Sequence, residues 1–108
     1  MALREQSYLI LLGLSQGPLH GYGVIKAVRE LSEERVRLGA GTLYGALDRL
    51  TGDGLVIVVK EEVVSGRYRR YYDLTGHGRQ VLAEETARLA RLAATAQHRL
   101  RLQPGMGM

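Results

Sequence analysis

The feature that most constrains this chain is one β-hairpin pattern among segments with helical patterns. Residues 55–64 are rich in β-branched side chains, Ser65-Gly66 is a turn signal, and residues 67–74 alternate arginine with tyrosine. The spacing predicts two antiparallel strands. Because side chains alternate along a strand, the return strand would present two rows, Tyr68, Arg70, Tyr72 and Leu74 on one side and Arg69, Tyr71 and Asp73 on the other.

Three short helical segments precede the hairpin. Residues 3–14 predict a nearly buried helix, and Ser15-Gln16-Gly17-Pro18 is a clear break. Residues 20–32 and 40–53 carry apolar side chains at spacings of three and four, which predicts two amphipathic helices. Gly54 is well placed as the left-handed residue that ends the third helix.

A long helix is predicted after the hairpin, over residues 76–102, with Thr75 as its N-cap. Its length of about 40 Å, at about 1.5 Å per residue, exceeds what three short helices and a hairpin can cover. The uncovered apolar stripe argues for a partner, and we expect a homodimer. The expected dimerisation residues are Leu82, Leu89, Leu92, Ala93, Ala96 and Leu100. Residues 103–108 are predicted to be a disordered tail.

Length and composition exclude several classes of protein. The 108 residues fit one small domain with an arm and leave no room for a second core. The absence of cysteine excludes disulfide scaffolds and sites that need a thiolate. No apolar run approaches the roughly 20 residues that span a bilayer, and no secretory signal is evident. We therefore expect a cytoplasmic protein without membrane association.

The net charge of +4 is unevenly distributed. Residues 1–54 carry six basic and six acidic side chains, whereas residues 55–108 carry nine and five. The tightest basic cluster is Arg67-Tyr68-Arg69-Arg70, at the hairpin. The predicted helices would therefore read sequence by fit and hydrogen bonding, and the hairpin would supply charge for phosphates.

The predicted order is helix, helix, helix, hairpin, long helix, a mainly α (α+β) fold. This order describes a winged helix-turn-helix with a two-stranded wing over residues 1–75 and a dimerisation helix over residues 76–102. The third helix would enter a major groove, which admits one α-helix, and the basic wing would reach adjacent phosphates.

Four motifs carry a family resemblance. They are Pro18-Leu19-His20-Gly21-Tyr22-Gly23, Gly41-Thr42-Leu43-Tyr44-Gly45-Ala46-Leu47-Asp48-Arg49-Leu50, Asp53-Gly54-Leu55-Val56, and the run from Gly66 to Gly78 that contains Arg70-Tyr71-Tyr72-Asp73-Leu74-Thr75. In this combination the chain resembles PadR-type transcriptional regulators over about residues 3–92. The resemblance implies a winged-helix dimer, usually a repressor, whose long C-terminal helix is the main dimerisation element. The short C-terminal region resembles the compact branch, which has one dimerisation helix and no separate helical domain.

Candidate DNA contacts lie on the predicted helices. Tyr44 is expected at a phosphate or groove edge, with packing against the wing or a neighbouring helix as the alternative. Thr42 is a second candidate, although it could serve only the helix N-terminus. Arg49 could contact phosphate or pair with a neighbouring aspartate. His20 and Tyr22 begin the second helix, where backbone N–H groups favour an anion, and a core position is the alternative for Tyr22.

The wing supplies the remaining candidates. Arg67 and Arg69 are expected to make electrostatic contacts to DNA, and Arg70 either contacts DNA or forms an internal ion pair. Together, the contacts predict a sequence-specific regulator on an inverted-repeat operator, with half-sites about 10 bp apart or a multiple of that.

An enzyme is not expected, because the carboxylates and serines form no convergent site. No cofactor or metal site is expected, since the three histidines share no ligand spacing. The sequence neither identifies nor excludes a small apolar effector at the dimer interface. The alternative function is a winged-helix adaptor that binds protein without specific DNA binding.

Overall fold

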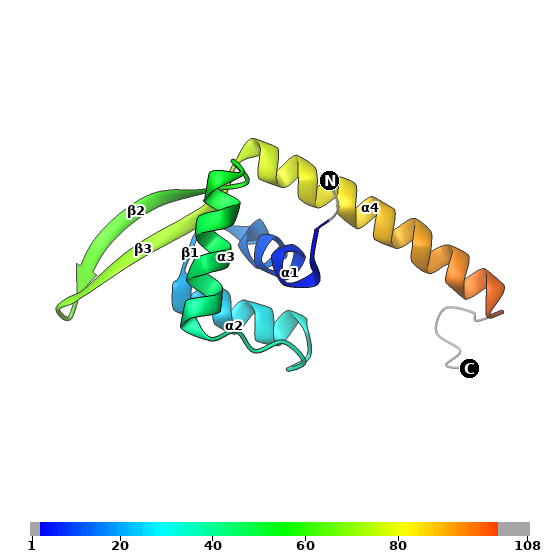
Figure 1. Ribbon diagram of the computed structural model, residues 1–108, viewed down its shortest axis with the longest axis horizontal. Coiled ribbons are helices and arrows are strands. Elements are labelled where there is room, and N and C mark those ends of the chain that lie inside the picture. Colours follow the sequence, from blue (N-terminus) through cyan, green and yellow to red (C-terminus); the bar gives the residue numbers. More distant parts are fainter. Residues whose placement is uncertain (1–2, 102–108) are drawn as a thin grey trace.

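Three helices enclose one hydrophobic core in the computed structural model, which describes residues 3–101 (Figure 1). They are α1 (Glu5–Gly13), α2 (Gly21–Leu31) and α3 (Ala40–Gly52), and a short 3₁₀ turn, η1 (Leu14–Gln16), follows α1. Fully buried side chains of the core include Ile10, Leu11, Leu14, Val24, Val28, Leu43, Leu47 and Leu55. The three predicted helices are confirmed, with ends that differ from the prediction by at most two residues.

A two-stranded wing projects from this core, as predicted (Figure 1). Strands β2 (Val56–Val64) and β3 (Arg67–Leu74) pair antiparallel in the register Val64↔Arg67, with a bulge between Val58 and Lys60. Ser65 and Gly66 join them with φ values of 51° and 76°, the left-handed conformations of a tight hairpin turn.

The sheet has a third strand that the sequence did not predict. Residues Leu19 and His20 form β1, which pairs with β3 so that Leu19 lies opposite Tyr72 and His20 opposite Tyr71. The strand order is β1-β3-β2. The assignment of His20 to the second helix was therefore wrong, because its backbone pairs with the wing and α2 begins one residue later.

The final helix, α4 (Gly76–Arg99), begins where predicted. The Thr75 hydroxyl accepts a hydrogen bond from the Gly78 N–H at 2.9 Å and donates one to the Gly54 carbonyl at 2.6 Å, so it caps α4 and ties it to the end of α3. Gly54 has a φ of 77°, as the C-terminal residue of a helix often does. The helix ends at Arg99, three residues short of the prediction, and the predicted tail at 103–108 lies outside the described residues.

The body of the protein covers only the first part of α4. Val81, Leu82 and Glu85 are buried, whereas every residue from Thr86 to Arg101 is exposed. Figure 1 shows the uncovered part extending well past α1. Leu82, predicted at the dimer interface, lies in the core of its own chain. No helix of the described residues is long and apolar enough to cross a membrane.

Polar contacts fasten the covered part of α4 to α1. The Glu85 carboxylate accepts two hydrogen bonds from Arg88, at 2.7 and 2.9 Å, and one from the Leu3 N–H at 3.4 Å. The Tyr8 and Thr86 hydroxyls lie 2.8 Å apart. Arg88 thereby forms an ion pair with the buried Glu85, three residues before it.

Candidate nucleic-acid interface

The outward face of α3 is free of core contacts. Leu43, Ala46, Leu47 and Leu50 are buried, whereas Thr42, Tyr44, Gly45, Asp48 and Arg49 are exposed. The N-cap Gly39 makes no side-chain hydrogen bond. A helix that presents small and polar residues in this way can approach another surface closely.

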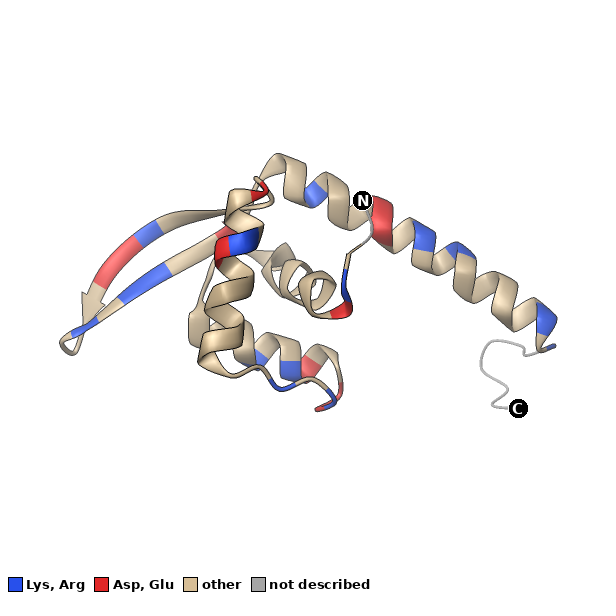
Figure 2. Cartoon of the chain, in the orientation of Figure 1, with Lys and Arg blue, Asp and Glu red and all other residues tan. Residues whose placement is uncertain are grey.

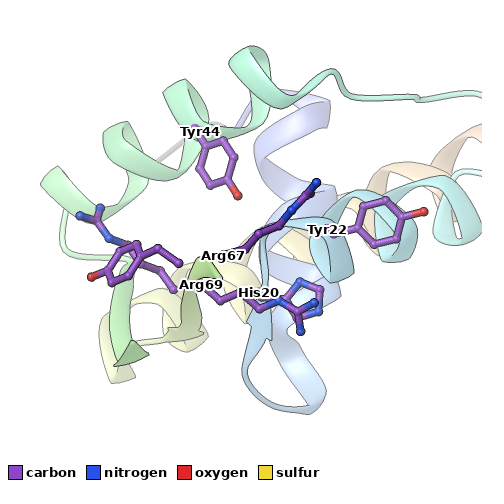
Figure 3. A pocket seen from close by; sticks show the side chains of 8 residues that line it. His20, Tyr22, Tyr44, Arg67 and Arg69 are labelled. Carbon is purple, nitrogen blue, oxygen red and sulfur yellow. The ribbon is translucent and has the colours of Figure 1, made fainter. Parts of the chain in front are cut away.

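Three elements meet beside Tyr44. Side chains from the start of α2, from α3 and from the tip of β3 line a hollow of about 270 Å³ (Figure 3). Its lining residues are His20, Gly21, Tyr22, Tyr44, Arg67, Tyr68, Arg69 and Arg70. The structure thus brings together six of the eight predicted DNA contacts. The exceptions are Thr42 and Arg49.

Tyr44 packs across the start of α2. A Cβ added at Gly21 would collide with the Tyr44 hydroxyl and ring, so only glycine permits this arrangement. Tyr44 remains 46% exposed. Both predicted roles of Tyr44 are therefore compatible, since its ring packs against a neighbouring helix while its edge stays accessible. The need for glycine at position 21 could not be predicted from the sequence, because it arises from the close approach of Tyr44 in α3.

His20 caps α2. Its Nδ1 accepts a hydrogen bond from the Gly23 N–H at 3.3 Å, and its ring stands edge-on to Tyr71 with 5.5 Å between ring centroids. Tyr22, the next side chain along, is 73% exposed, which excludes the alternative that it belongs to the core. The start of α2 therefore contributes the capping histidine and one exposed tyrosine to the lining of the hollow.

The wing arginines differ in their surroundings. Among residues 3–101, Arg70 forms an ion pair with Glu61 at 3.6 Å and lies 5.7 Å from the Tyr68 ring centroid. No ion pair of Arg67 or Arg69 is found in this part of the chain. Arg70 thus makes the internal contact that was its alternative, and the charges of Arg67 and Arg69 remain available at the wing tip.

Arg70 also faces α3. Together with Tyr44, Asp48, Tyr68 and Tyr72 it lines a second hollow between the wing and α3. Burial raises the pKa of Tyr72, which is 2% exposed, while the nearby Arg70 opposes that shift. The inner row of β3 therefore runs from buried Tyr72 near α3 to exposed Tyr68 near the tip.

The reverse face of the wing is internally paired. Tyr71 donates a hydrogen bond to Glu62 at 2.6 Å, and Lys60 pairs with the same carboxylate at 3.1 Å. The Tyr71 hydrogen bond, followed by that of Lys60, lowers the pKa of Glu62. Glu62 offsets the charge of Lys60, so the positive excess of the wing lies toward its tip. Figure 2 shows the basic and acidic positions along both strands.

Arg49 lies apart from these groups. It lines a different hollow with Leu3, Arg4, Ser7 and Asp53, beside the N-terminal segment. No ion pair with Asp48 or Asp53 is present among the described residues. Arg49 is therefore free for a partner, but not for one seated between α3 and the wing.

Comparison with known proteins identifies the family. The model of the transcriptional regulator PadR-like family matches residues 10–84, which include the wing and the covered part of α4. The chain belongs to the PadR-like family. Transcriptional regulator Rv3488 of Mycobacterium tuberculosis is 46% identical over 65 residues, 60% of each chain. The chain spans between a quarter and three fifths of the length of the curated relatives it matches.

Solved structures of PadR-like proteins share the fold. A PadR-like transcription factor from Bacteroides fragilis superposes with a TM-score of 0.72 at 36% identity, covering 85% of this chain and 86% of that one. Bacillus subtilis PadR, solved in complex with operator DNA, gives a TM-score of 0.68 at 25% identity over 77% of this chain and 47% of that one. The predicted winged helix-turn-helix is thereby confirmed. The family to which this chain belongs is one of transcriptional regulators.

Proposed function

We propose that this regulator binds an inverted-repeat operator as a homodimer and represses transcription. The hollow where Tyr44, the start of α2 and the wing arginines converge carries the proposal. A protruding helix face beside a basic hairpin matches the groove and backbone of duplex DNA. The Bacillus subtilis relative was solved with operator DNA, which supports the same ligand for this chain. A regulator of this kind acts in the cytoplasm, where the chromosome lies.

The proposed DNA contacts fall into two groups. Residues of α3 would contact bases in the groove, and residues at the start of α2 would contact the edge of the groove. Residues of the wing would bind phosphates. Thr42 and Tyr44 belong to the groove, with His20 and Tyr22 at its edge. Arg67 and Arg69 bind phosphate, Arg70 joins them by exchanging its partner Glu61, and Arg49 reaches phosphate on the far flank of α3.

Dimerisation would use the uncovered face of α4. Leu89, Leu92 and Leu100 are 36%, 57% and 67% exposed, and Ala93 and Ala96 are exposed beside them. The stripe continues the face that Val81 and Leu82 bury against the protomer's own core. An apolar surface of that length favours a second copy of the chain. Residues 1–75 are thus the DNA-binding unit, residues 76–102 the dimerisation helix, and a small apolar effector would enter between the protomers.

Selection from random duplex DNA, repeated at two salt concentrations, tests this function. We expect one enriched inverted repeat with half-sites about 10 bp apart, or a multiple of it, and weaker binding at the higher salt concentration. A wild-type protein that enriches no motif and shows no salt dependence would instead be a winged-helix adaptor. Transcription from a promoter carrying the selected repeat then shows whether the bound protein represses.

A further inference from the structure

Residues 1–54 carry equal numbers of basic and acidic side chains, but on α2 the basic side chains form a separate stripe. Lys26 and Arg29 follow Tyr22 at spacings of four and three, so the three residues form one exposed stripe along α2. Tyr22 also lines the hollow with Arg67 and Arg69, which makes this stripe continuous with the wing. Figure 2 shows basic bands along α2 and along the segment that leads into α3.

Two acidic residues on and just after α2 lie outside this stripe. Glu30 lines a hollow with Leu12 and Ala27, between α1 and α2. Glu33 lines another with Glu5 and Arg35, beside the start of α1. Glu30 and Glu33 thus border α1, and the stripe of Tyr22, Lys26 and Arg29 contains no acidic side chain.

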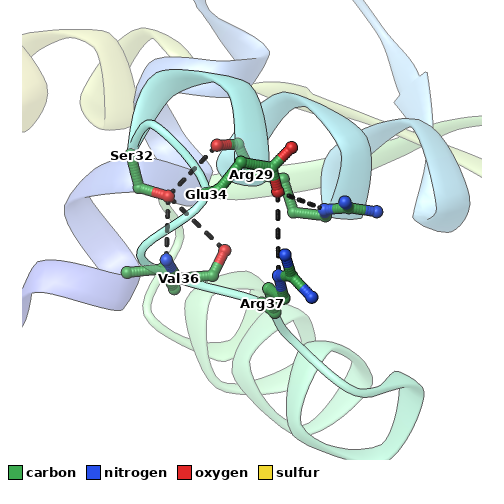
Figure 4. Close-up of polar contacts among 5 residues, drawn as sticks. All are labelled: Arg29, Ser32, Glu34, Val36 and Arg37. Atoms are coloured by element: carbon green, nitrogen blue, oxygen red, sulfur yellow. Dashed lines mark hydrogen bonds and ion pairs between the residues drawn. The ribbon is translucent and has the colours of Figure 1, made fainter.

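The exception is Glu34, which bridges two arginines on the basic side (Figure 4). Its carboxylate lies 2.9 Å from the Arg29 Nε and 3.7 Å from the Arg37 Nε. All three side chains are well exposed, by 44% for Arg29, 55% for Glu34 and 68% for Arg37. A carboxylate between two guanidinium groups occupies the place that a phosphate oxygen would take.

The backbone is shaped to hold this bridge. Glu33 and Glu34 have φ values of 54° and 68°, a left-handed conformation that residues other than glycine adopt uncommonly. The Glu34 N–H donates to the Arg29 carbonyl at 2.8 Å, and the Ser32 hydroxyl accepts from the Val36 N–H at 2.9 Å. Such backbone outliers persist only where surrounding contacts fix them, and they cluster at functional sites.

We propose that Lys26, Arg29 and Arg37 form a second phosphate-binding surface, continuous with the wing, and that Glu34 holds its arginines in place until DNA replaces the carboxylate. The inference rests on the proposed DNA-binding function and extends it. The first helix of a helix-turn-helix crosses the backbone, and the stripe lies on that helix in α2. Arg37 lies two residues before the N-cap of α3, the helix that would enter the groove.

Lys26→Ala and Arg37→Ala test this surface, with Arg35→Ala as the matched control. Arg35 lies on the same segment with the same charge but faces α1. Binding of the selected duplex and of a scrambled duplex is measured across a salt series by fluorescence anisotropy. We expect Lys26→Ala and Arg37→Ala each to reduce the slope of log K against log salt by about 1 per protomer, for both duplexes alike. Arg35→Ala should keep the wild-type slope.

Glu34→Gln removes the competing charge while keeping the shape of the side chain. We expect it to bind both duplexes more tightly than wild type at low salt, with thermal unfolding unchanged. Wild-type slopes in Lys26→Ala and Arg37→Ala, a loss in Arg35→Ala as large as in Arg37→Ala, or no tightening in Glu34→Gln would each overturn the inference. These outcomes differ from failure of the proposed function, in which the wild-type protein itself shows no salt-dependent binding.

Discussion

The phenol of Tyr44 in α3 lies directly against the α-carbon of Gly21 at the start of α2, so closely that a Cβ at position 21 would collide with it. The contact joins the outward face of α3 to the start of α2. It also determines where the exposed edge of Tyr44 points. The geometry of the proposed DNA surface therefore depends on a glycine that need not touch DNA itself.

Gly21→Ala should displace Tyr44 from this position. Because the tyrosine is half exposed, it can swing outward, and we expect the free energy of unfolding to change by less than about 1 kcal/mol. DNA affinity should fall as far as it does in Tyr44→Ala, and the double variant should lose little more. Gly23→Ala is the control, since a Cβ there meets only Leu19 at ordinary contact distance. Wild-type affinity in Gly21→Ala would show that the position of Tyr44 is unimportant.

Leu89→Asp should convert the dimer into a monomer. It places a charge in the middle of the uncovered stripe of α4, where burial against a partner would leave it unpaired. Thr95→Asp, on the opposite side of the same exposed helix, should remain dimeric. Sedimentation velocity distinguishes the two variants. A Leu89→Asp protein that still sediments as a dimer would place the interface elsewhere.

Acid should weaken the attachment of α4 to the N-terminal segment through Glu85. The hydrogen bonds from Arg88, and then the Leu3 amide, lower the pKa of this carboxylate from its ordinary 4.5. A lowered folded-state pKa means that the stabilisation is present above the unfolded pKa and is lost as pH falls through the folded value. The melting temperature of the wild type should therefore be higher than that of Glu85→Gln at pH 7. The difference between the two melting temperatures should shrink below about pH 4.5. The exposed Glu84→Gln is the control, and a difference that persists unchanged in acid would contradict the account.

Local patterns predicted the elements whose causes are local. The hydroxyl of Thr75 satisfies the Gly78 N–H three residues later, and Ser65-Gly66 adopts the left-handed turn that its composition favours. That two-residue turn also sets the register of the hairpin, with Val64 opposite Arg67. In each case the residues that determine the structure lie within a few positions of it.

The missed features depend on contacts between distant residues. Strand β1 forms because Leu19 and His20 pair with Tyr72 and Tyr71, which lie far later in the chain. The basic stripe on α2 was not predicted from the sequence for a similar reason. Counting charges along residues 1–54 gives neutrality, and only the packing of α1 against α2 shows that Glu30 and Glu33 border α1 while Lys26 and Arg29 are exposed.

The wing tip carries the proposed phosphate contacts, because Arg67 and Arg69 are its basic side chains without an ion-pair partner among residues 3–101. We expect Arg67→Ala and Arg69→Ala each to weaken binding to all duplexes and to lower the salt slope by about 1 per protomer. Arg91→Ala, exposed on α4 away from the wing, serves as the charge control.

The most direct measurement is the salt dependence of duplex binding by the Arg67→Ala/Arg69→Ala double variant beside wild type and Arg91→Ala. The account predicts that the double variant loses about 2 from the slope per protomer, with Arg91→Ala unchanged. A double variant that keeps the wild-type slope would remove the wing from the DNA interface and contradict the account.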